Sequence, residues 1–426
     1  MKDIFKVHNV DARKIGTIVK EPIVDVTITS PPYFNLKDYG YKNQIGFGQK
    51  YNEYLEDLRL VFEQVFDITK DSGTLWVIID TFRKDGEVVP LPFDFSNKIS
   101  EVGWKLQEVI IWGKDRTVPW AHKGQMRSLF EYVLLFSKTK NYNFNIDKVR
   151  DFQSLKKWWV KYPERYNPKG KTPEAIWNFD IPMQGSWGKG YIKHFCPLPE
   201  DMIAQMLKIT TEENDVVLDC FSGSGAVLSK ADNMKRRYIG FELNEDYISM
   251  FNNYLKETGK QKRKEYELEE KGSMEQNKFQ KLILDLRALK FARLFYRKLK
   301  AEGLDEIIKI HVERSQATPQ KVNSLFVIQY DVLVKSISQK NRIETFLNHA
   351  ISKAPLSKFG IDPRFRFISN INDFYDLLSN KKLYSYTTQV THKFKKEFVL
   401  EELIDLPKSD IIISRIKVNL DEKDYE

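Results

Sequence analysis

Four consecutive residues, Ser30-Pro31-Pro32-Tyr33, follow an apolar run and could do chemistry on a planar ring. Proline lacks a backbone N–H and fixes φ, so the run before it cannot continue as a strand. The tip then presents a hydroxyl, a carbonyl outside the strand ladder and an aromatic ring. These groups suit a ring with an exocyclic amine, because Tyr33 can stack on the ring while Ser30 and the Pro31 carbonyl accept the amine hydrogens.

Such an amine is a poor nucleophile, because its lone pair is delocalised into the ring. Two acceptors outside the ring plane favour a more tetrahedral nitrogen, and holding that nitrogen in line with a sulfonium methyl group supplies proximity. The tip therefore indicates methyl transfer to an amino group. The alternative is a proline-rich turn that only ends a strand.

A second candidate site is the glycine loop in "VVLDCFSGSGAVL". An apolar strand ends at Asp219, and Phe221, Gly223 and Gly225 lead into a helix; the glycines allow a tight turn and close approach of a ligand to backbone N–H groups. Glu242 comes seventeen residues after Gly225, at the end of the next strand, where a carboxylate can accept hydrogen bonds from both hydroxyls of a ribose. The loop predicts an adenosine-containing cofactor, either S-adenosylmethionine or a nicotinamide dinucleotide.

Alternating strand and helix patterns surround both candidate sites. Strands are expected at 24–30, 73–80, 104–114, 129–138, 215–220 and 236–243, and helices at 51–69, 199–210, 225–234 and from Glu245 to about Lys256. Strands separated by helices predict an α/β fold with a mostly parallel, doubly wound sheet. Ligands bind at the carboxyl ends of such strands near the switch point, so the tip and the glycine loop should face each other.

Composition limits the class of protein. The chain has 426 residues, of which 42% are hydrophobic and 13% aromatic, and its net charge of +9 suits a nucleic-acid partner. Two cysteines, Cys196 and Cys220, exclude a disulfide framework and a cysteine-based zinc site, and no metal is predicted. No run approaches the roughly 18 apolar residues of a membrane span, so we expect a cytoplasmic protein.

Between residues 141 and 193 the periodicity fades, and tryptophan and tyrosine interleave with lysine and arginine. Such a segment is typical of an insertion that contacts nucleic acid. The candidates for phosphate contact and base-step support are Lys156, Lys157, Trp158, Trp159, Lys161 and Arg165. A local core under a long loop is the alternative for the tryptophan pair.

Eight motifs, in order, resemble those of bacterial amino-type DNA methyltransferases of the β arrangement. They are "TSPPYFNLKDYG", "QIGFG", "GTLWVIID", "IIWGK", "FEYVLLFSK", "HFCPLPEDMI", "LDCFSGSG" and "GFELNEDYI". In that arrangement the catalytic motif precedes the target-recognition region, and the S-adenosylmethionine motif follows both. The resemblance covers roughly residues 1–256 and implies a Rossmann-like, S-adenosylmethionine-dependent methyltransferase fold with a circularly permuted motif order.

The resemblance also assigns roles to residues. It implies a catalytic motif at Ser30, Pro31, Pro32 and Tyr33, and a cofactor site at Asp219, Phe221, Gly223, Gly225, Glu242, His194 and Pro197. Two positions depart from the family pattern. Cys220 stands where proline is usual, which should be tolerated because a small residue suffices there, and bulky Phe195 follows His194. A packed histidine is the alternative for His194.

In this family, serine at the first catalytic position goes mostly with cytosine N4, and aspartate or asparagine with adenine N6. Ser30 therefore favours N4-methylation of cytosine in double-stranded DNA, reached by flipping the base out of the duplex. N6-methylation of adenine is the alternative. Two further classes explain less of the sequence: a methyltransferase-like nucleic-acid-binding protein without turnover, and a nicotinamide-dependent oxidoreductase, which leaves the tip unused.

The expected domain organisation has five parts. Residues 1–140 form the catalytic half of the methyltransferase domain, 141–193 the target-recognition insertion, 194–258 the cofactor-binding half, 259–280 a charged linker or an extension of the preceding helix, and 281–426 a mixed α/β C-terminal domain. Double-stranded DNA is the expected partner, and the sequence does not show whether a cognate restriction endonuclease exists as well. Neither the oligomeric state nor the role of residues 281–426 follows from the sequence.

Overall fold

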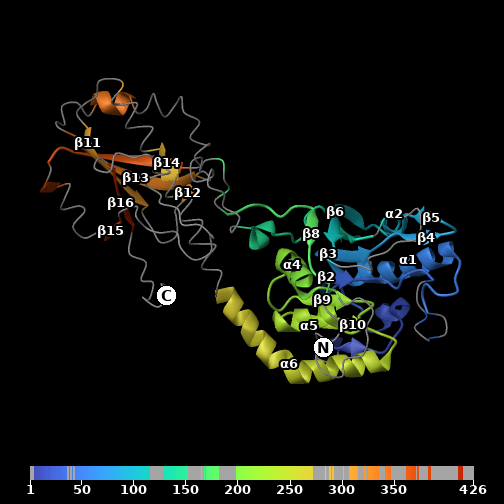
Figure 1. Cartoon of the computed structure of the whole chain (residues 1–426). Coiled ribbons are helices and arrows are strands. Elements are labelled where there is room, and N and C mark those ends of the chain that lie inside the picture. The colour runs from blue at the N-terminus through green and yellow to red at the C-terminus, as the bar shows by residue number, and fades with distance from the viewer. Residues whose placement is uncertain are drawn as a thin grey trace. The chain divides into compact units, whose positions relative to one another are not determined.

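The structure, a computed structural model, divides the chain into two compact units (Figure 1). The first unit is Met1–Val149 with Thr172–Gly272, and the second is Arg150–Lys171 with Ser273–Glu426. The described residues are 4–35, 38, 41, 44–115, 126, 128–151, 165, 167, 169–181, 198–271, 284, 287–288, 290–291, 301, 307–314, 321–322, 325–334, 341–346, 361–370, 372–373, 382–384 and 411–415.

A twisted sheet forms the centre of the first unit. Its described strands lie in the order β1 (Val7–His8), β10 (Arg237–Phe241), β9 (Val216–Asp219), β2 (Val24–Thr29), β3 (Thr69–Ile79), β7 (Phe130–Ser137), β6 (Lys105–Gly113) and β8 (Ile176–Asn178). Among these strands β7 runs antiparallel to both neighbours, and the other pairs are parallel. The predicted mostly parallel sheet is therefore confirmed. The reversal of β7 was not predicted, because a strand buried on both faces reads as a continuous apolar run in either direction.

Helices cover both faces of this sheet. One face is covered by the 3-10 helix η2 (Ala12–Thr17) and by helices α1 (Tyr51–Ile68) and α2 (Leu91–Ser100). The other face is covered by α4 (Glu200–Thr210) and α5 (Ala226–Asn233). Alternate residues of β3 point to opposite faces of the sheet. Leu75 and Val77 lie in the core that the sheet forms with η2, α1 and α2, and Trp76 lies in the core that it forms with α4 and α5. Each such fully buried apolar side chain contributes about 1.5–3 kcal/mol to folding.

The pairing of β2 with β9 places the two candidate sites beside each other. Val26 pairs with Val217 and Thr27 with Leu218, although about half the chain separates the two strands. Both strands end at the same edge of the sheet, because they are parallel. The helix that follows β2 covers one face and the helix that follows β9 covers the other. This edge is therefore the topological switch point, where open α/β sheets bind ligands.

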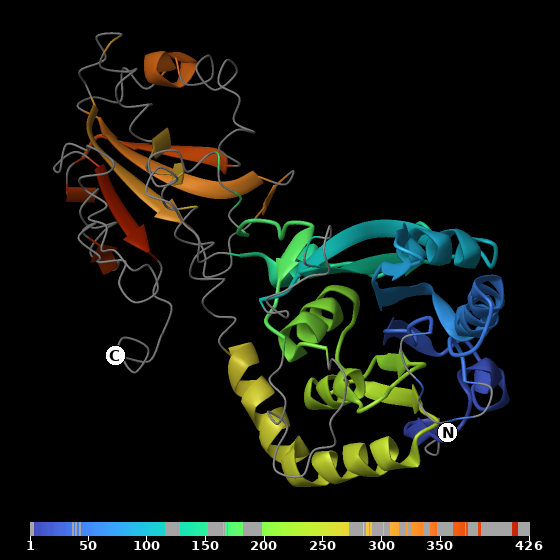
Figure 2. The same ribbon diagram turned by 45° about the vertical axis from the view of Figure 1, so that its right-hand side comes forward.

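Helix α6 (Glu245–Lys271) lies beside α5 and the β1–β10 edge of the sheet (Figure 2). The predicted end of this helix near Lys256 was wrong, and the alternative of a helix extension into the charged segment is confirmed up to Lys271. Two contacts hold this part: Arg263 donates to Asp232 at 2.5 Å, and buried Arg236 donates to the Tyr266 hydroxyl at 3.1 Å. Within the described residues, no helix is long and apolar enough to cross a membrane.

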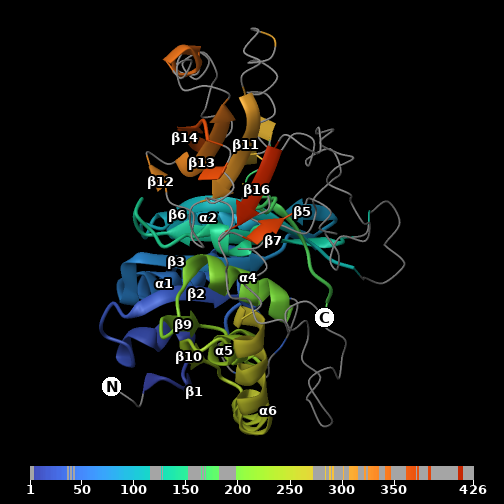
Figure 3. The same ribbon diagram turned by 90° about the vertical axis from the view of Figure 1, so that its left-hand side faces the viewer.

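The second unit contains a mixed sheet (orange to red in Figure 3). Its described strands are β11 (Ile307–Arg314), β12 (Lys321–Val322), β13 (Leu325–Val334), β14 (Ile361–Ile368), β15 (Lys382–Tyr384) and β16 (Ile411–Arg415). Strand β13 pairs with β14 in parallel and with β11 in antiparallel fashion. Buried Tyr330 of β13 donates to the Ala288 carbonyl at 3.1 Å, and its neighbour Asp331 accepts from Arg366 at 2.8 Å.

Candidate active site

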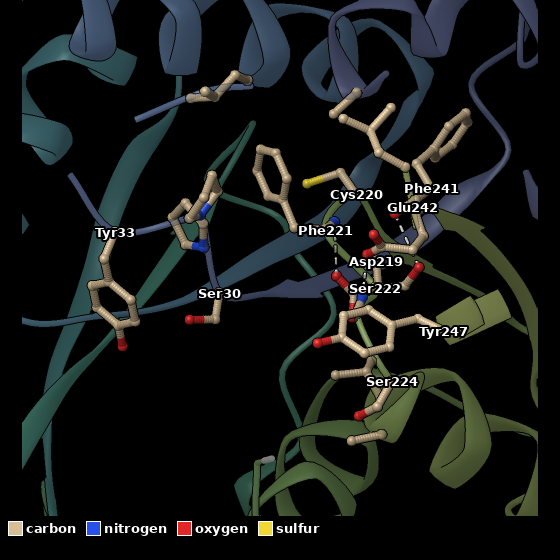
Figure 4. Close-up of a pocket in the computed structure, with 18 of the residues that line it drawn as sticks. Ser30, Tyr33, Asp219, Cys220, Phe221, Ser222, Ser224, Phe241, Glu242 and Tyr247 are labelled. Carbon is tan, nitrogen blue, oxygen red and sulfur yellow. Dashed lines mark hydrogen bonds between the residues drawn. The ribbon is translucent and has the colours of Figure 1, made fainter. Parts of the chain in front are cut away.

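A cavity of about 180 Å³ opens at the carboxyl ends of β2, β9 and β10. The tip and the glycine loop both line it. The predicted residues that meet there are Ser30, Pro31, Pro32, Tyr33, Asp219, Phe221, Gly223 and Glu242. In Figure 4, Ser30 and Tyr33 lie on one side and Glu242 and Tyr247 on the other, with the Phe221 ring between them. The cavity therefore has two halves, each supplied by a different motif.

The backbone of the tip is held by helix α1 and by the segment "QIGFG". The Tyr54 hydroxyl of α1 donates to the Pro32 carbonyl at 2.9 Å, and the Gly46 carbonyl accepts from the Asn35 N–H at 2.5 Å. Gly46 has φ +93°, and a Cβ at this position would lie 3.1 Å from the Tyr33 carbonyl oxygen. Glycine is needed here because it alone combines this backbone conformation with so close an approach.

Gly225 ends the glycine loop and starts helix α5, although it does not itself line the cavity. It has φ +84°, and a Cβ there would lie 2.2 Å from the Phe251 ring. Its N–H donates to the Ser222 carbonyl at 2.7 Å, and the Ser222 hydroxyl donates to the Phe241 carbonyl at 2.9 Å. The loop is thus a tight turn whose shape depends on the absence of a side chain.

Two backbone N–H groups fix the carboxylate of Glu242 at the wall of the half of the cavity that contains the glycine loop. Oε2 accepts from the Gly223 N–H and Oε1 from the Asn244 N–H, both at 2.8 Å. Asn9 holds the backbone on the other side by donating to the Glu242 carbonyl at 3.2 Å and to the Leu243 carbonyl at 2.8 Å. A carboxylate oxygen can accept two hydrogen bonds. The arrangement can therefore receive paired hydroxyls such as those of a ribose.

Asp219 is buried at the base of the cavity. Its Oδ1 accepts from the Thr29 hydroxyl at 2.7 Å and from the Phe221 N–H at 3.1 Å. Burial raises the pKa of the Asp219 carboxyl to about 7, and the negative charge of Glu242 acts in the same direction, against these two hydrogen bonds. A cation bound in the cavity would favour the ionised carboxylate. Neighbouring Cys220 is buried as well, with Sγ 3.6 Å from Thr29 Oγ1.

A DNA methylase family model, N6_N4_Mtase, matches residues 24–253, which is just over half of the chain. The chain belongs to this family. It is similar to the type II methyltransferase M.SmaI of Serratia marcescens, with 28% identity over 56% of this chain and 87% of that protein. It is also similar to the type II methyltransferase M.BglII of Bacillus subtilis, with 30% identity over 58% of this chain and 67% of that protein.

Two solved structures are also similar to part of the chain. PvuII DNA methyltransferase (cytosine-N4-specific) is 20% identical, with a TM-score of 0.48 over 58% of this chain and 85% of that one. The M1.HpyAVI–SAM complex is 20% identical, with a TM-score of 0.41 over 59% of this chain and 98% of that one.

The protein is therefore a DNA methyltransferase that uses S-adenosylmethionine. The predicted family, fold and cofactor are confirmed. The oxidoreductase alternative is set aside, since a DNA methylase family model covers both the Ser30–Tyr33 tip and the glycine loop.

Seven of the other predicted residues fall outside the described residues: His194, Pro197, Lys156, Lys157, Trp158, Trp159 and Lys161. Arg165 is exposed and belongs to the second unit. Sequence reasoning missed the cavity-lining residues Asp11, Tyr41, Gln44, Trp112, Glu131 and Tyr247. Four of these lie inside quoted motifs: Gln44 in "QIGFG", Trp112 in "IIWGK", Glu131 in "FEYVLLFSK" and Tyr247 in "GFELNEDYI". Their places within these motifs could have pointed to the four residues from the sequence.

Proposed function

We propose that the protein methylates the exocyclic N4 of cytosine at a specific sequence of double-stranded DNA, as the modification part of a restriction-modification system. The observation that carries the proposal is the shared cavity, in which Ser30 and Tyr33 face the glycine loop and Glu242. An acceptor-bearing aromatic tip and a cofactor loop have no separate reason to share one cavity. Together they form the two halves of a methyl-transfer site.

The half that contains the glycine loop fits S-adenosylmethionine. Glu242 would accept the ribose hydroxyls, and the rings of Phe221 and Tyr247 offer apolar surfaces on either side of the loop. Gly223 and Gly225 keep side chains out of the turn. When bound, S-adenosylmethionine supplies an electrophilic methyl group on a sulfonium sulfur.

The half that contains the tip would receive the flipped cytosine. Tyr33 stacks on the base, which offsets part of the few kcal/mol lost when the base leaves the duplex. Ser30 Oγ and the Pro31 carbonyl accept the two amine hydrogens, turn the nitrogen lone pair out of the ring plane and hold it toward the cofactor half. Acceptors fixed before the reaction cost no reorganisation when positive charge develops on the amine nitrogen.

Two observations support the finer parts of the proposal. Serine at position 30, rather than aspartate or asparagine, supports cytosine as the target. The names of M.SmaI and M.BglII, both type II methyltransferases, support a restriction-modification context with a cognate endonuclease. We assign recognition of the DNA sequence to the basic, aromatic segment 141–193, including Lys156, Lys157, Trp158, Trp159, Lys161 and Arg165. We also assign cofactor contacts to His194 and Pro197.

The site-specific part of this proposal is tested by expressing the protein in a bacterial host without DNA modification and sequencing the host DNA for modified bases. We expect modified cytosines confined to one short sequence context, and resistance of that sequence to an endonuclease that cuts it. Modified adenines in one context would move the assignment to adenine N6. Modified cytosines without a shared context would contradict site specificity.

The buried Asp219 predicts a pH dependence of cofactor binding. A cationic ligand lowers the pKa of Asp219 from about 7, so binding releases a proton and affinity rises as the pH increases through this value. We expect the affinity for S-adenosylmethionine to rise about three- to tenfold between pH 6 and pH 8. Calorimetric titrations at several pH values measure this. Asp219→Asn keeps an acceptor for Thr29 and Phe221 and should flatten the profile; an equally steep profile in that variant would assign the dependence to another group.

A further inference from the structure

We propose that Glu131, paired with Lys114, is a positioning residue that fixes the ring of Tyr33 for stacking on the target base. This inference rests on the proposed function, because it takes Tyr33 as the residue that contacts the base. It adds two residues to the site, neither of which has a role in the account given so far.

The contacts come from a pair of antiparallel strands beside the tip. Strand β7 carries Glu131 opposite Trp112 of β6, and Lys114 follows β6 directly. The Tyr33 hydroxyl donates to Glu131 Oε2 at 3.3 Å, and the Lys114 ammonium donates to the other carboxylate oxygen. Glu131 is only 6% exposed, yet both it and Trp112 line the cavity.

Lys114 explains how a carboxylate can be kept at this buried position. An ion removed from water is costly unless it is paired and hydrogen-bonded, and here one carboxylate oxygen meets the ammonium while the other meets the phenol. The Lys114 ammonium also lies 5.2 Å from the centroid of the Trp112 ring, a cation–π distance. Strands β6 and β7 therefore hold Lys114 and Glu131 in place without help from the tip.

Fixing the hydroxyl fixes the place of the ring and favours one ring plane. The hydroxyl oxygen lies on the axis of the Cβ–Cγ bond, so its bond to a rigid strand removes rotation about Cα–Cβ. The plane follows because a phenolic O–H prefers to lie in the plane of its ring, and this O–H points at the Glu131 carboxylate. Stacking orients the flipped base, and a misplacement of about 1 Å can lower the rate of an aligned reaction about 100-fold. Glu131 thus affects methyl transfer through Tyr33 without touching the reacting atoms itself.

The test is a double-mutant cycle with Tyr33→Phe and Glu131→Leu, measured as single-turnover methylation of cytosine-containing duplex DNA at saturating S-adenosylmethionine. Each single variant should lower the rate about tenfold, since each removes a hydrogen bond to a charged group. The double variant should be no slower than the slower single variant, because both changes remove the same bond. The cofactor affinity of Tyr33→Phe should remain that of the wild type.

Tyr51→Phe is the matched control, because the Tyr51 hydroxyl donates to the Asp94 carboxylate at 2.8 Å outside the cavity. It should leave the methylation rate unchanged. If Glu131→Leu does not fold, Lys114→Met combined with Glu131→Leu removes both charges and takes its place in the cycle.

The outcomes separate this inference from the proposed function. A wild-type rate in Tyr33→Phe, or independent losses that multiply in the double variant, would overturn the positioning role. If Tyr33→Ala also keeps the wild-type rate, the proposed contact between Tyr33 and the base fails as well. If Tyr33→Ala abolishes methylation while Tyr33→Phe does not, the positioning role alone is rejected.

Discussion

Replacing Ser30 with alanine is expected to lower the single-turnover methylation rate about 100-fold or more while leaving the affinity for S-adenosylmethionine unchanged. The hydroxyl lies in the tip half of the cavity, on the opposite side from Glu242 and Tyr247. Its removal takes away an acceptor that acts on the amine in the transition state and leaves the cofactor half intact. Rapid-quench kinetics and calorimetric titration of the same preparation measure the two quantities.

Tyr33→Ala should give a comparable loss of turnover, since it removes the stacking surface, and its cofactor affinity should also stay close to that of the wild type. Ser100→Ala is a suitable control, because this serine donates to the Asn97 carbonyl at the end of α2, away from the cavity. Equal losses of cofactor affinity in Ser30→Ala, Tyr33→Ala and Gly225→Ala would contradict the division of the cavity into two halves.

Replacing Gly225 with alanine should have the opposite profile, with weak cofactor binding and a less stable fold. The new Cβ would lie 2.2 Å from the Phe251 ring, so the loop or the ring must move. Overpacking costs about 1–3 kcal/mol and the left-handed backbone about 1–2 kcal/mol, which together predict a loss of about 2–5 kcal/mol in the free energy of unfolding. We expect cofactor affinity to fall at least about tenfold, because the loop that carries Gly223 and contacts Glu242 is displaced.

Gly86→Ala separates the two causes. Gly86 has φ +86°, close to the φ +84° of Gly225, but a Cβ there would meet nothing within 4 Å. Denaturant unfolding of this variant should show the backbone cost alone, about 1–2 kcal/mol, with unchanged cofactor affinity. A Gly225→Ala variant no less stable than Gly86→Ala would show that the contact with Phe251 does not constrain the loop.

Much of the first unit could be predicted from the sequence, because its signals are local. Apolar runs bounded by proline and glycine predicted β2 and β3, and helical spacing predicted α1 and α4. The meeting of Ser30 with the glycine loop followed from a general rule, that parallel strands bind ligands at their carboxyl ends. The structure provides the contact behind that rule in the pairing of β2 with β9.

What could not be predicted depends on contacts between distant segments. Nothing local shows that Gly46 must approach the Tyr33 carbonyl, or that Glu131 lies within reach of the Tyr33 hydroxyl. The length of α6 was underestimated for the same reason. Its charged second half looks like a solvated linker until Arg236 and Asp232, on other elements, are seen to hold it.

The most direct test of the central claim is the identity of the base that the purified protein methylates. Unmethylated genomic DNA is incubated with the protein and S-adenosylmethionine, digested to nucleosides and analysed by mass spectrometry. We predict N4-methylcytosine with the wild-type protein, and a methylation rate that Ser30→Ala lowers about 100-fold or more. N6-methyladenine would retain the two-sided cavity and contradict the cytosine assignment, whereas no methylated nucleoside from a preparation that binds the cofactor would contradict the proposed reaction.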